Sequence, residues 1–301
     1  MSKSFKFTLT MLAIFTLSTL LALPLYDVLF PYFKFEKIFN RLIMIFSVTA
    51  AAIFVLMSKA NQEKRLSKPA VWKEYGFDFS APWRRLWVRG FLIGVVLIVL
   101  IVAVEIAFGP QYLRRPVLLQ DVIERFFKGM LSGIAIGIIE EFFFRGFVFT
   151  WLKQRMNLWV AIFLASGFYS LTHFFDNGQI FIPSDPSVGD ALRLLLGYLE
   201  PLFIRPFDIL PEFFGLFLFG ILLNLVFVRT HTLFTSIGIH AGAVFVIKFQ
   251  YSFVRKGPDL YDAWFGRAPC YDGVFEWLLL VILGCVILCA IFPREHFQKH
   301  L

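Results

Sequence analysis

Apolar residues in this chain fall into continuous blocks, each about as long as a lipid bilayer is thick. A helix needs about 20 apolar residues to cross the roughly 30 Å hydrocarbon core of a membrane. Of the 301 residues, 58% are hydrophobic and 17% are charged, whereas about a quarter of an average soluble domain is charged. We therefore predict an integral membrane protein of the all-α class, folded as a polytopic helical bundle.

The blocks predict about eight transmembrane helices. We interpret the first block as a retained helix rather than a signal peptide, because it lacks a small-x-small cleavage site and further blocks follow. No internal repeat is evident, so an inverted-repeat transporter gains no support. The predicted spans are residues 7–30, 39–58, 87–108, 128–151, 157–175, 211–229, 232–253 and 274–292.

The distribution of Lys and Arg predicts the orientation. These residues concentrate between positions 59 and 89, and loops rich in Lys and Arg stay in the cytoplasm. With eight spans, both termini are then cytoplasmic. Arg114, Arg115, Arg255 and Lys256 fall on the outer side in this topology and oppose it. The net charge of +8 is explained by these loops, and no basic stripe interleaved with aromatic residues predicts a nucleic-acid partner.

Two connecting segments are distinctive. Residues 71–89 place Trp72, Trp83 and Trp87 among basic residues, a pattern typical of a membrane interface. The longest polar insertion covers residues 176–211 and contains a short amphipathic stretch at 191–199. We expect this insertion at the outer surface, and nothing in it indicates catalysis.

The block 128–151 contains charged residues where a membrane span should be apolar: Glu140, Glu141 and Arg145. Each ionised group at the bilayer centre costs roughly 3 kcal/mol on insertion scales, so charged residues there indicate a function by default. An internal salt bridge that only holds helices together is the structural alternative.

Helical spacing separates the roles of the two carboxylates. Glu141 and Arg145 are four residues apart and share a face, so they can pair. Glu140 is rotated by about 100° from Glu141 and is less well neutralised, which makes it the candidate general base. Gly133 and Gly137 lie on the face that continues to Glu141 and allow another helix to approach closely.

Two histidines lie in other spans. His173 ends the next block, where a lone histidine is more often a satisfied polar residue than a catalyst. His240 lies in the middle of block 232–253 and must face a polar partner or a cavity. If Glu140, His173 and His240 converge, they form a site that activates water. Glu140 could take the proton while the histidines stabilise an oxyanion; alternatively, the three side chains could hold a divalent metal such as zinc. No cofactor is otherwise indicated.

These residues resemble the signature of the CAAX protease and bacteriocin-processing (CPBP, or Abi) family of intramembrane proteases. The family has Glu-Glu-x3-Arg, then Phe-x3-His, then His-x3-Asn on three helices, and the resemblance covers roughly residues 120–250. Glu140, Glu141 and Arg145 complete the first motif. Tyr169 replaces the Phe before His173, and Val244 replaces the Asn after His240. Ser236 or Asn224 are candidates to replace that Asn.

The resemblance implies an endopeptidase that hydrolyses a peptide bond within the membrane. Glu140 would activate the water, His173 and His240 would stabilise the oxyanion or bind metal, and Glu141 and Arg145 would support them. It further implies a peptide or protein substrate, a bacterial inner (cell) membrane location, and a protease core at residues 116–255. Residues 1–115 would be an N-terminal membrane and interfacial region, and residues 256–301 a last helix and tail.

Two other functions remain open at this point. A proton-coupled transporter could use the same carboxylate and imidazoles as a relay. A non-catalytic membrane scaffold or immunity protein is the third hypothesis, which the missing Asn at position 244 sustains.

Overall fold

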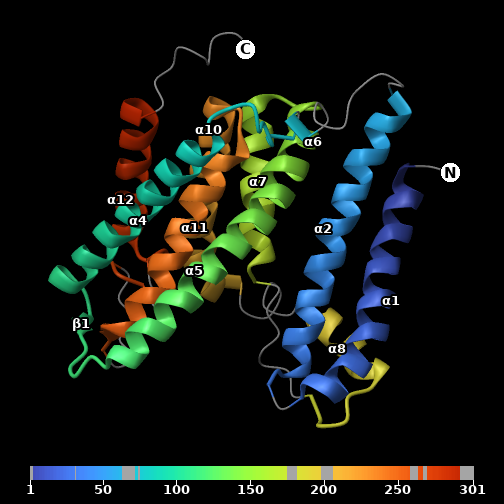
Figure 1. Cartoon of the computed structure of the whole chain (residues 1–301), viewed down its shortest axis with the longest axis horizontal. Helices are drawn as coiled ribbons and strands as arrows, with labels where there is room; N and C mark the ends of the chain where they lie inside the picture. The colour runs from blue at the N-terminus through green and yellow to red at the C-terminus, as the bar shows by residue number, and fades with distance from the viewer. Residues whose placement is uncertain are drawn as a thin grey trace. The chain divides into compact units, whose positions relative to one another are not determined.

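A computed structural model describes residues 3–30, 32–62, 72–73, 75–174, 182–197, 206–257, 264–266 and 270–291 (Figure 1). Over these residues the fold is helical apart from one pair of three-residue strands, which confirms the all-α prediction. The chain divides into two compact units. Unit 1 comprises Met1–Arg65 and Thr172–Ile209, and unit 2 comprises Leu66–Leu171 and Leu210–Leu301. The three regions proposed from the sequence, with boundaries after residues 115 and 255, remain a prediction.

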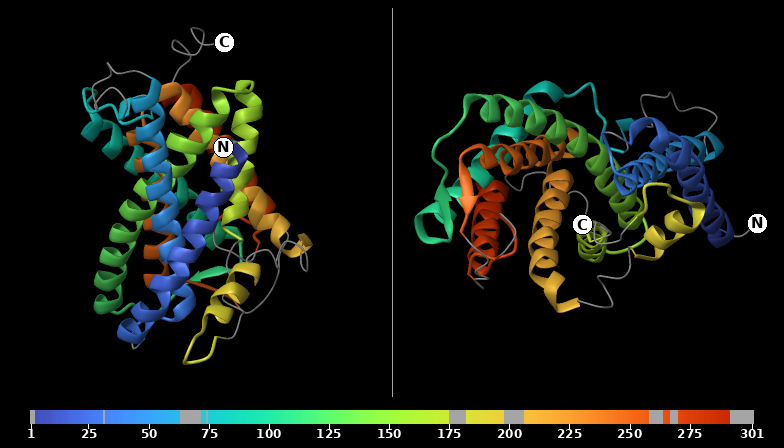
Figure 2. Two further views of the ribbon diagram at one scale, coloured as in Figure 1. Left: turned by 90° about the vertical axis from the view of Figure 1, so that its right-hand side faces the viewer. Right: turned by 90° about the horizontal axis from the view of Figure 1, so that it is seen from below.

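Unit 1 is built on a helical hairpin. Helices α1 (Lys3–Leu29) and α2 (Phe35–Gln62) pack against each other and lie side by side in Figures 1 and 2. The short helix α8 (Val188–Gly197) packs on α1, with Ala191 and Leu194 buried against aromatic residues of the hairpin. The amphipathic stretch predicted in the long insertion is therefore a helix, and its apolar side closes the core of this unit.

Unit 2 holds the remaining elements, apart from the last residue of α7 and the first four of α10. Strands β1 (Gln111–Leu113) and β2 (Val254–Lys256) pair antiparallel, with Tyr112 opposite Arg255. A π-helix, η1, continues α5 directly, and a 3-10 turn, η2, and a second π-helix, η3, follow α11 and α12. The helices are α4 (Trp83–Phe108), α5 (Leu119–Glu141), η1 (Phe142–Phe149), α6 (Thr150–Lys153), α7 (Leu158–Thr172), α10 (Pro206–Thr230), α11 (Leu233–Phe249), η2 (Gln250–Ser252), α12 (Val274–Val286) and η3 (Ile287–Ile291).

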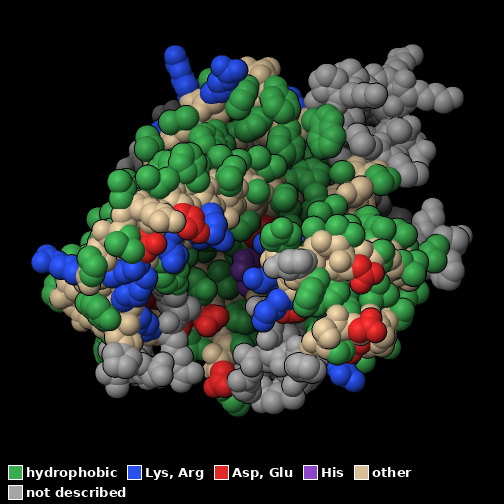
Figure 3. Space-filling view, turned by 60° about the horizontal axis from the view of Figure 1, so that its bottom comes forward, with side chains coloured by type: hydrophobic (Ala, Val, Ile, Leu, Met, Phe, Trp, Pro, Cys, Tyr) green, Lys and Arg blue, Asp and Glu red, His purple; other side chains and the backbone are tan. Residues whose placement is uncertain are grey.

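Every predicted span coincides with a helix, but eight spans are not confirmed. In the described part of the chain, four helices are long and apolar enough to cross a membrane, namely Leu9–Leu29, Trp83–Phe108, Pro206–Thr230 and Leu233–Ser252. Leu158–Thr172 and Val274–Cys289 are apolar but shorter. The helical run through α5 and η1 carries Glu140, Glu141 and Arg145, which lower its hydropathy. These helices identify an integral membrane protein, and Figure 3 shows the broad area of hydrophobic side chains that one face presents.

Helix α11 is the centre of unit 2, packed between α4 and α5. Along the span Leu233–Ser252, 78% of the most apolar window is buried. Glycines make this possible because a methyl group on any of them would meet the neighbouring backbone. An added Cβ would lie 2.1 Å from Ile239 O at Gly94, 2.2 Å from Phe91 O at Gly242 and 2.5 Å from Ala241 O at Gly133. The close approach predicted at Gly133 and Gly137 is confirmed, and its partner is α11.

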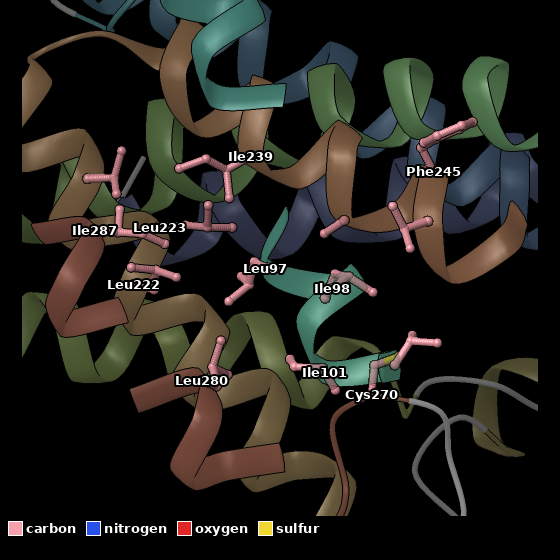
Figure 4. Packing of buried hydrophobic residues seen from close by; sticks show 14 of the residues in the cluster. Leu97, Ile98, Ile101, Leu222, Leu223, Ile239, Phe245, Cys270, Leu280 and Ile287 are labelled. Carbon is pink, nitrogen blue, oxygen red and sulfur yellow. The ribbon is translucent and has the colours of Figure 1, made fainter. Parts of the chain in front are cut away.

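The hydrophobic core of unit 2 joins α4, α10, α11 and α12 (Figure 4). Leu97 and Ile101 of α4 are almost fully buried, as are Leu223 of α10 and Ile239 of α11. Leu280 of α12 and Ile287 of η3 are also buried in this core. This packing fixes one side of α11 and leaves its other side for the polar residues of α5 and η1.

A turn before α4 covers the beginning of α11. Gly76, at φ +91°, accepts hydrogen bonds at its carbonyl from Leu233 N (2.8 Å) and Thr232 Oγ1 (3.2 Å). A Cβ at Gly76 would lie 2.6 Å from the Phe227 ring, so both its conformation and its surroundings require glycine. Thr232 also caps α11 by accepting from Phe234 N. The interfacial position predicted for residues 71–89 remains a prediction.

We expect Gly242→Ala to destabilise the protein by about 1–3 kcal/mol, because the new methyl group overpacks the α4–α11 contact. Thermal unfolding in detergent micelles measures the effect. Gly167→Ala is the matched control, since nothing lies within 4 Å of a Cβ at Gly167 and Ala favours a helix over Gly by about 1 kcal/mol. Equal melting temperatures for the two variants would contradict the proposed packing.

Candidate active site

The charged residues of the first motif lie where α5 changes into the π-helix η1. Glu140 and Glu141 are the last two residues of α5, and Arg145 lies within η1. A π-helix is rare and occurs frequently at functional sites. The Thr150 hydroxyl donates to Arg145 O at 3.0 Å, which satisfies a carbonyl in this irregular stretch. The sequence predicted one regular helix here and gave no signal for the wider turn.

Glu141 and Arg145 form a fully buried ion pair. Arg145 Nη1 donates to Glu141 Oε1 at 2.7 Å, and the side chains of Arg145 and Glu141 are 1% and 0% exposed. Arg145 Nη2 lies 3.4 Å from Gly220 O of α10, and its guanidinium stacks on the Tyr169 ring at 4.5 Å from the centroid. The pairing predicted from the four-residue spacing is present, and α7 and α10 hold its cationic end.

Glu141 also binds His240 of α11. His240 Nδ1 lies 2.8 Å from Glu141 Oε1. An ionised carboxylate only accepts hydrogen bonds, so Nδ1 carries a hydrogen and donates. The rings of Tyr169 and Phe219 meet the imidazole edge-on, with centroids 6.1 and 5.6 Å away. The imidazole is therefore held by one hydrogen bond and two aromatic rings, with Nε2 directed elsewhere.

Glu140 lies on the Nε2 side of His240. Glu140 Oε2 is 3.9 Å from His240 Nε2, and the Glu140 side chain is 21% exposed, in contrast to the closed Glu141. A separation of 3.9 Å is too long for a direct hydrogen bond. Polar atoms more than 3.5 Å apart can be bridged by a water molecule that bonds both. The two groups are thus spaced to share one water, with the carboxylate on one side and the imidazole on the other.

The Nδ1 contact restricts what Nε2 can do. When His240 is neutral, its single hydrogen is on Nδ1, so Nε2 can accept a proton or bind a metal. When the ring is protonated, Nε2 also carries a hydrogen and can donate to a developing oxyanion. Two carboxylates, one guanidinium and one imidazolium sum to zero charge, which lowers the cost of burying this group of side chains.

The two candidates for the missing Asn have different surroundings. The Ser236 hydroxyl donates to Leu233 O at 3.1 Å, and its side chain lies near the Glu141 carboxylate. Asn224 Nδ2 donates to Ser166 Oγ of α7 at 3.0 Å and lies 3.5 Å from Ile162 O, so its described bonds do not reach His240. Ser236 therefore contacts the site, whereas Asn224 joins α10 to α7. Val244 lies one turn after His240 on α11.

His173 follows α7 and belongs to unit 1, whereas Glu140 and His240 belong to unit 2. Its participation in the site stays a prediction. The metal alternative also stays a prediction. Glu140 and His240 offer an oxygen and a nitrogen that zinc accepts, while no group of three His, Cys, Asp or Glu side chains among the described residues could hold a metal ion.

Sequence reasoning missed the partners that α10 and the aromatic residues supply. Phe219 is one of forty phenylalanines, and nothing in the sequence distinguishes it from the others. Gly220 contributes a carbonyl, which a sequence pattern does not reveal. Tyr169 could have been identified, because it lies one turn before His173 and departs from the family residue at that position.

A comparison with known protein families supports the family that the sequence motifs predicted. Residues 123–246 match the family model described as type II CAAX prenyl endopeptidase Rce1-like. The match covers less than half of the chain and contains all three motifs, so the family predicted from them is confirmed for this region. No curated protein and no solved structure matches the chain. The protein is thus a membrane protein that carries a CAAX-protease-like region.

We expect Arg145→Met to destabilise the protein by about 3–5 kcal/mol, because it leaves the buried Glu141 carboxylate without its charge partner. Unfolding in detergent micelles measures the loss. Lys128→Met is the control, since the Lys128–Glu124 pair is 71% and 51% exposed and exposed pairs contribute at most about 1 kcal/mol. A double variant, Glu141→Gln with Arg145→Met, should recover part of the loss; no difference between Arg145→Met and the control would contradict the ion pair's role.

Proposed function

We propose that this protein is an intramembrane endopeptidase in which Glu140 activates a water molecule and His240 stabilises the oxyanion that forms. The observation that carries the proposal is the 3.9 Å separation between Glu140 Oε2 and His240 Nε2. The partly open carboxylate faces an imidazole whose other nitrogen is fixed by Glu141. The match of residues 123–246 to a family of prenyl endopeptidases supports peptide-bond hydrolysis as the reaction.

In the proposed reaction, Glu140 takes a proton from the water as its oxygen attacks the peptide carbonyl carbon. The carbonyl oxygen becomes an oxyanion, to which the protonated His240 donates from Nε2. The C–N bond then breaks, and Glu140 returns the proton to the leaving amine. Glu140 is then ionised again, as it was before the reaction, and His240 keeps its proton throughout. His173 is the proposed second donor to the oxyanion.

Glu141 and Arg145 are positioning residues in this scheme. Glu141 orients the imidazole through Nδ1, as the buried carboxylate does in a Ser-His-Asp triad. Arg145 holds Glu141 in its ionised form at that position. A metal ion held by Glu140, His173 and His240 has no part in this scheme, because no three His, Cys, Asp or Glu side chains among the described residues are grouped to hold one.

The proposed substrate is the C-terminal peptide of a prenylated protein, presented from the membrane. This class follows from the description of the matched family, and an apolar prenyl chain would partition into the bilayer that the candidate spans cross. We further propose the bacterial inner membrane as the location, with both termini in the cytoplasm. The transporter has no specific observation in its favour, and the non-catalytic scaffold has only Val244 in place of the family Asn.

Glu140→Gln should lower peptide hydrolysis by roughly 10²–10⁴-fold, because an amide cannot accept the proton of the water. The assay follows new peptide ends from a farnesylated CAAX peptide, beside the same peptide without the lipid, on purified protein in liposomes. Glu124→Gln, on the same helix but exposed, is the control and should retain full activity. Unchanged hydrolysis in Glu140→Gln would exclude its role as base, and solute flux without new peptide ends would indicate a transporter.

His173→Ala should lower kcat by about 10²-fold or more while leaving the melting temperature close to that of the wild type, if His173 donates to the oxyanion. His231→Asn is the matched control, because His231 adopts φ 53° in the turn between α10 and α11 and Asn tolerates this conformation. Full activity in His173→Ala would remove His173 from the site and leave Glu140 and His240 as its catalytic pair.

A further inference from the structure

The first two turns of α4 form an open groove outside the candidate active site. The groove has a volume of about 410 Å³ and is lined by Arg84, Arg85, Val88, Arg89 and Leu92. It is bounded by the side chains of three arginines and two aliphatic residues on one face of a helix that is long and apolar enough to cross a membrane. Neither the reaction nor the packing of α11 uses this surface.

The aliphatic part of the groove continues along the outer face of α4. Val88, Leu92 and Val96 are four residues apart and 48%, 57% and 56% exposed. Side chains at this spacing form one stripe along a helix, and at 1.5 Å per residue the stripe is about 12 Å long. An exposed apolar stripe of this kind packs more favourably against hydrocarbon chains than against water.

The three arginines are exposed and lie around the first residue of that stripe, Val88. Arg84 and Arg85 have no carboxylate partner among the residues that the structure describes. Arg84 lies over the Trp83 ring at 5.2 Å from its centroid, and Trp83 packs against Phe234 of α11 at 5.4 Å. The base of the groove is therefore anchored in unit 2, and tryptophan at a span's end is typical of the headgroup level of a membrane.

We propose that this groove binds the headgroup of an anionic phospholipid, with the upper part of an acyl chain lying along Val88, Leu92 and Val96. Planar guanidinium groups bind phosphate oxygens in a bidentate manner. Arg84 and Arg85 precede the aliphatic stripe along α4, as the phosphate precedes the acyl chains along a phospholipid. A soluble anion would use only the arginines, whereas a neutral lipid would use only the stripe.

The test measures phosphatidylglycerol binding to the full chain in detergent micelles by native mass spectrometry. Changing Arg84, Arg85 and Arg89 together to Gln should weaken binding at this site roughly fivefold for each arginine, and added salt should weaken binding to the wild type. The matched control changes Arg115, Arg125 and Arg255 to Gln, which removes the same charge elsewhere on unit 2 and should preserve binding.

A second variant separates binding from folding. Replacement of the three arginines by Lys keeps their charge and should retain most of the binding, and melting temperatures confirm that each variant is folded. Equal binding by the Gln variant and the wild type overturns the proposal. So does equal affinity for phosphatidylcholine, or competition by glycerol phosphate as effective as that by the intact lipid, which would indicate a site for a soluble anion.

Discussion

One carboxylate without solvent contact, Glu141, and its partner Arg145 join η1, α11, α7 and α10. Glu141 accepts from Arg145 of the π-helix η1 and from His240 of α11, and Arg145 in turn stacks on Tyr169 of α7 and reaches Gly220 O of α10. A lone charge in this position would be prohibitively costly, so the ion pair and the imidazole must be present together. The proposed chemistry at Glu140 depends on this arrangement, because it orients the only described imidazole beside that carboxylate.

The orientation of His240 also depends on how α11 is held. Gly90 and Gly94 of α4, Gly133 and Gly137 of α5, and the glycines of α11 itself bring backbones into direct contact on two sides of this helix. In lipid, such close packing replaces the hydrophobic effect as the force that associates helices. A shift of α11 would displace His240 from both glutamates, so the geometry of the site depends on the packing of α11.

Much of this arrangement could be predicted from local spacing. The Glu141–Arg145 pair follows from four residues on a helix, and the close approach at Gly133 and Gly137 follows from their lack of a side chain. The charged motif and the two histidines were sufficient to identify the family. The spacing did not indicate that His240 bonds Glu141, because contacts between separate helices leave no pattern in one sequence. The π-helix and the roles of Phe219 and Gly220 had no signal either. Eight spans are not confirmed, because α5 carries charged residues and α7 and α12 are short.

Contacts made through glycine have no side-chain torsions to adjust. Helices α4, α11 and α5 can therefore shift against one another only as rigid bodies, and even small shifts meet backbone atoms. The contacts of α7 with α10 and η1 are different, because they use aromatic rings such as Phe144 with Phe168 and Phe163 with Phe217. Aromatic side chains can change their torsion angles between rotamers, so a bulky ligand is more readily accommodated beside α7 and α10. The glycine-packed helices α4, α5 and α11 keep their positions.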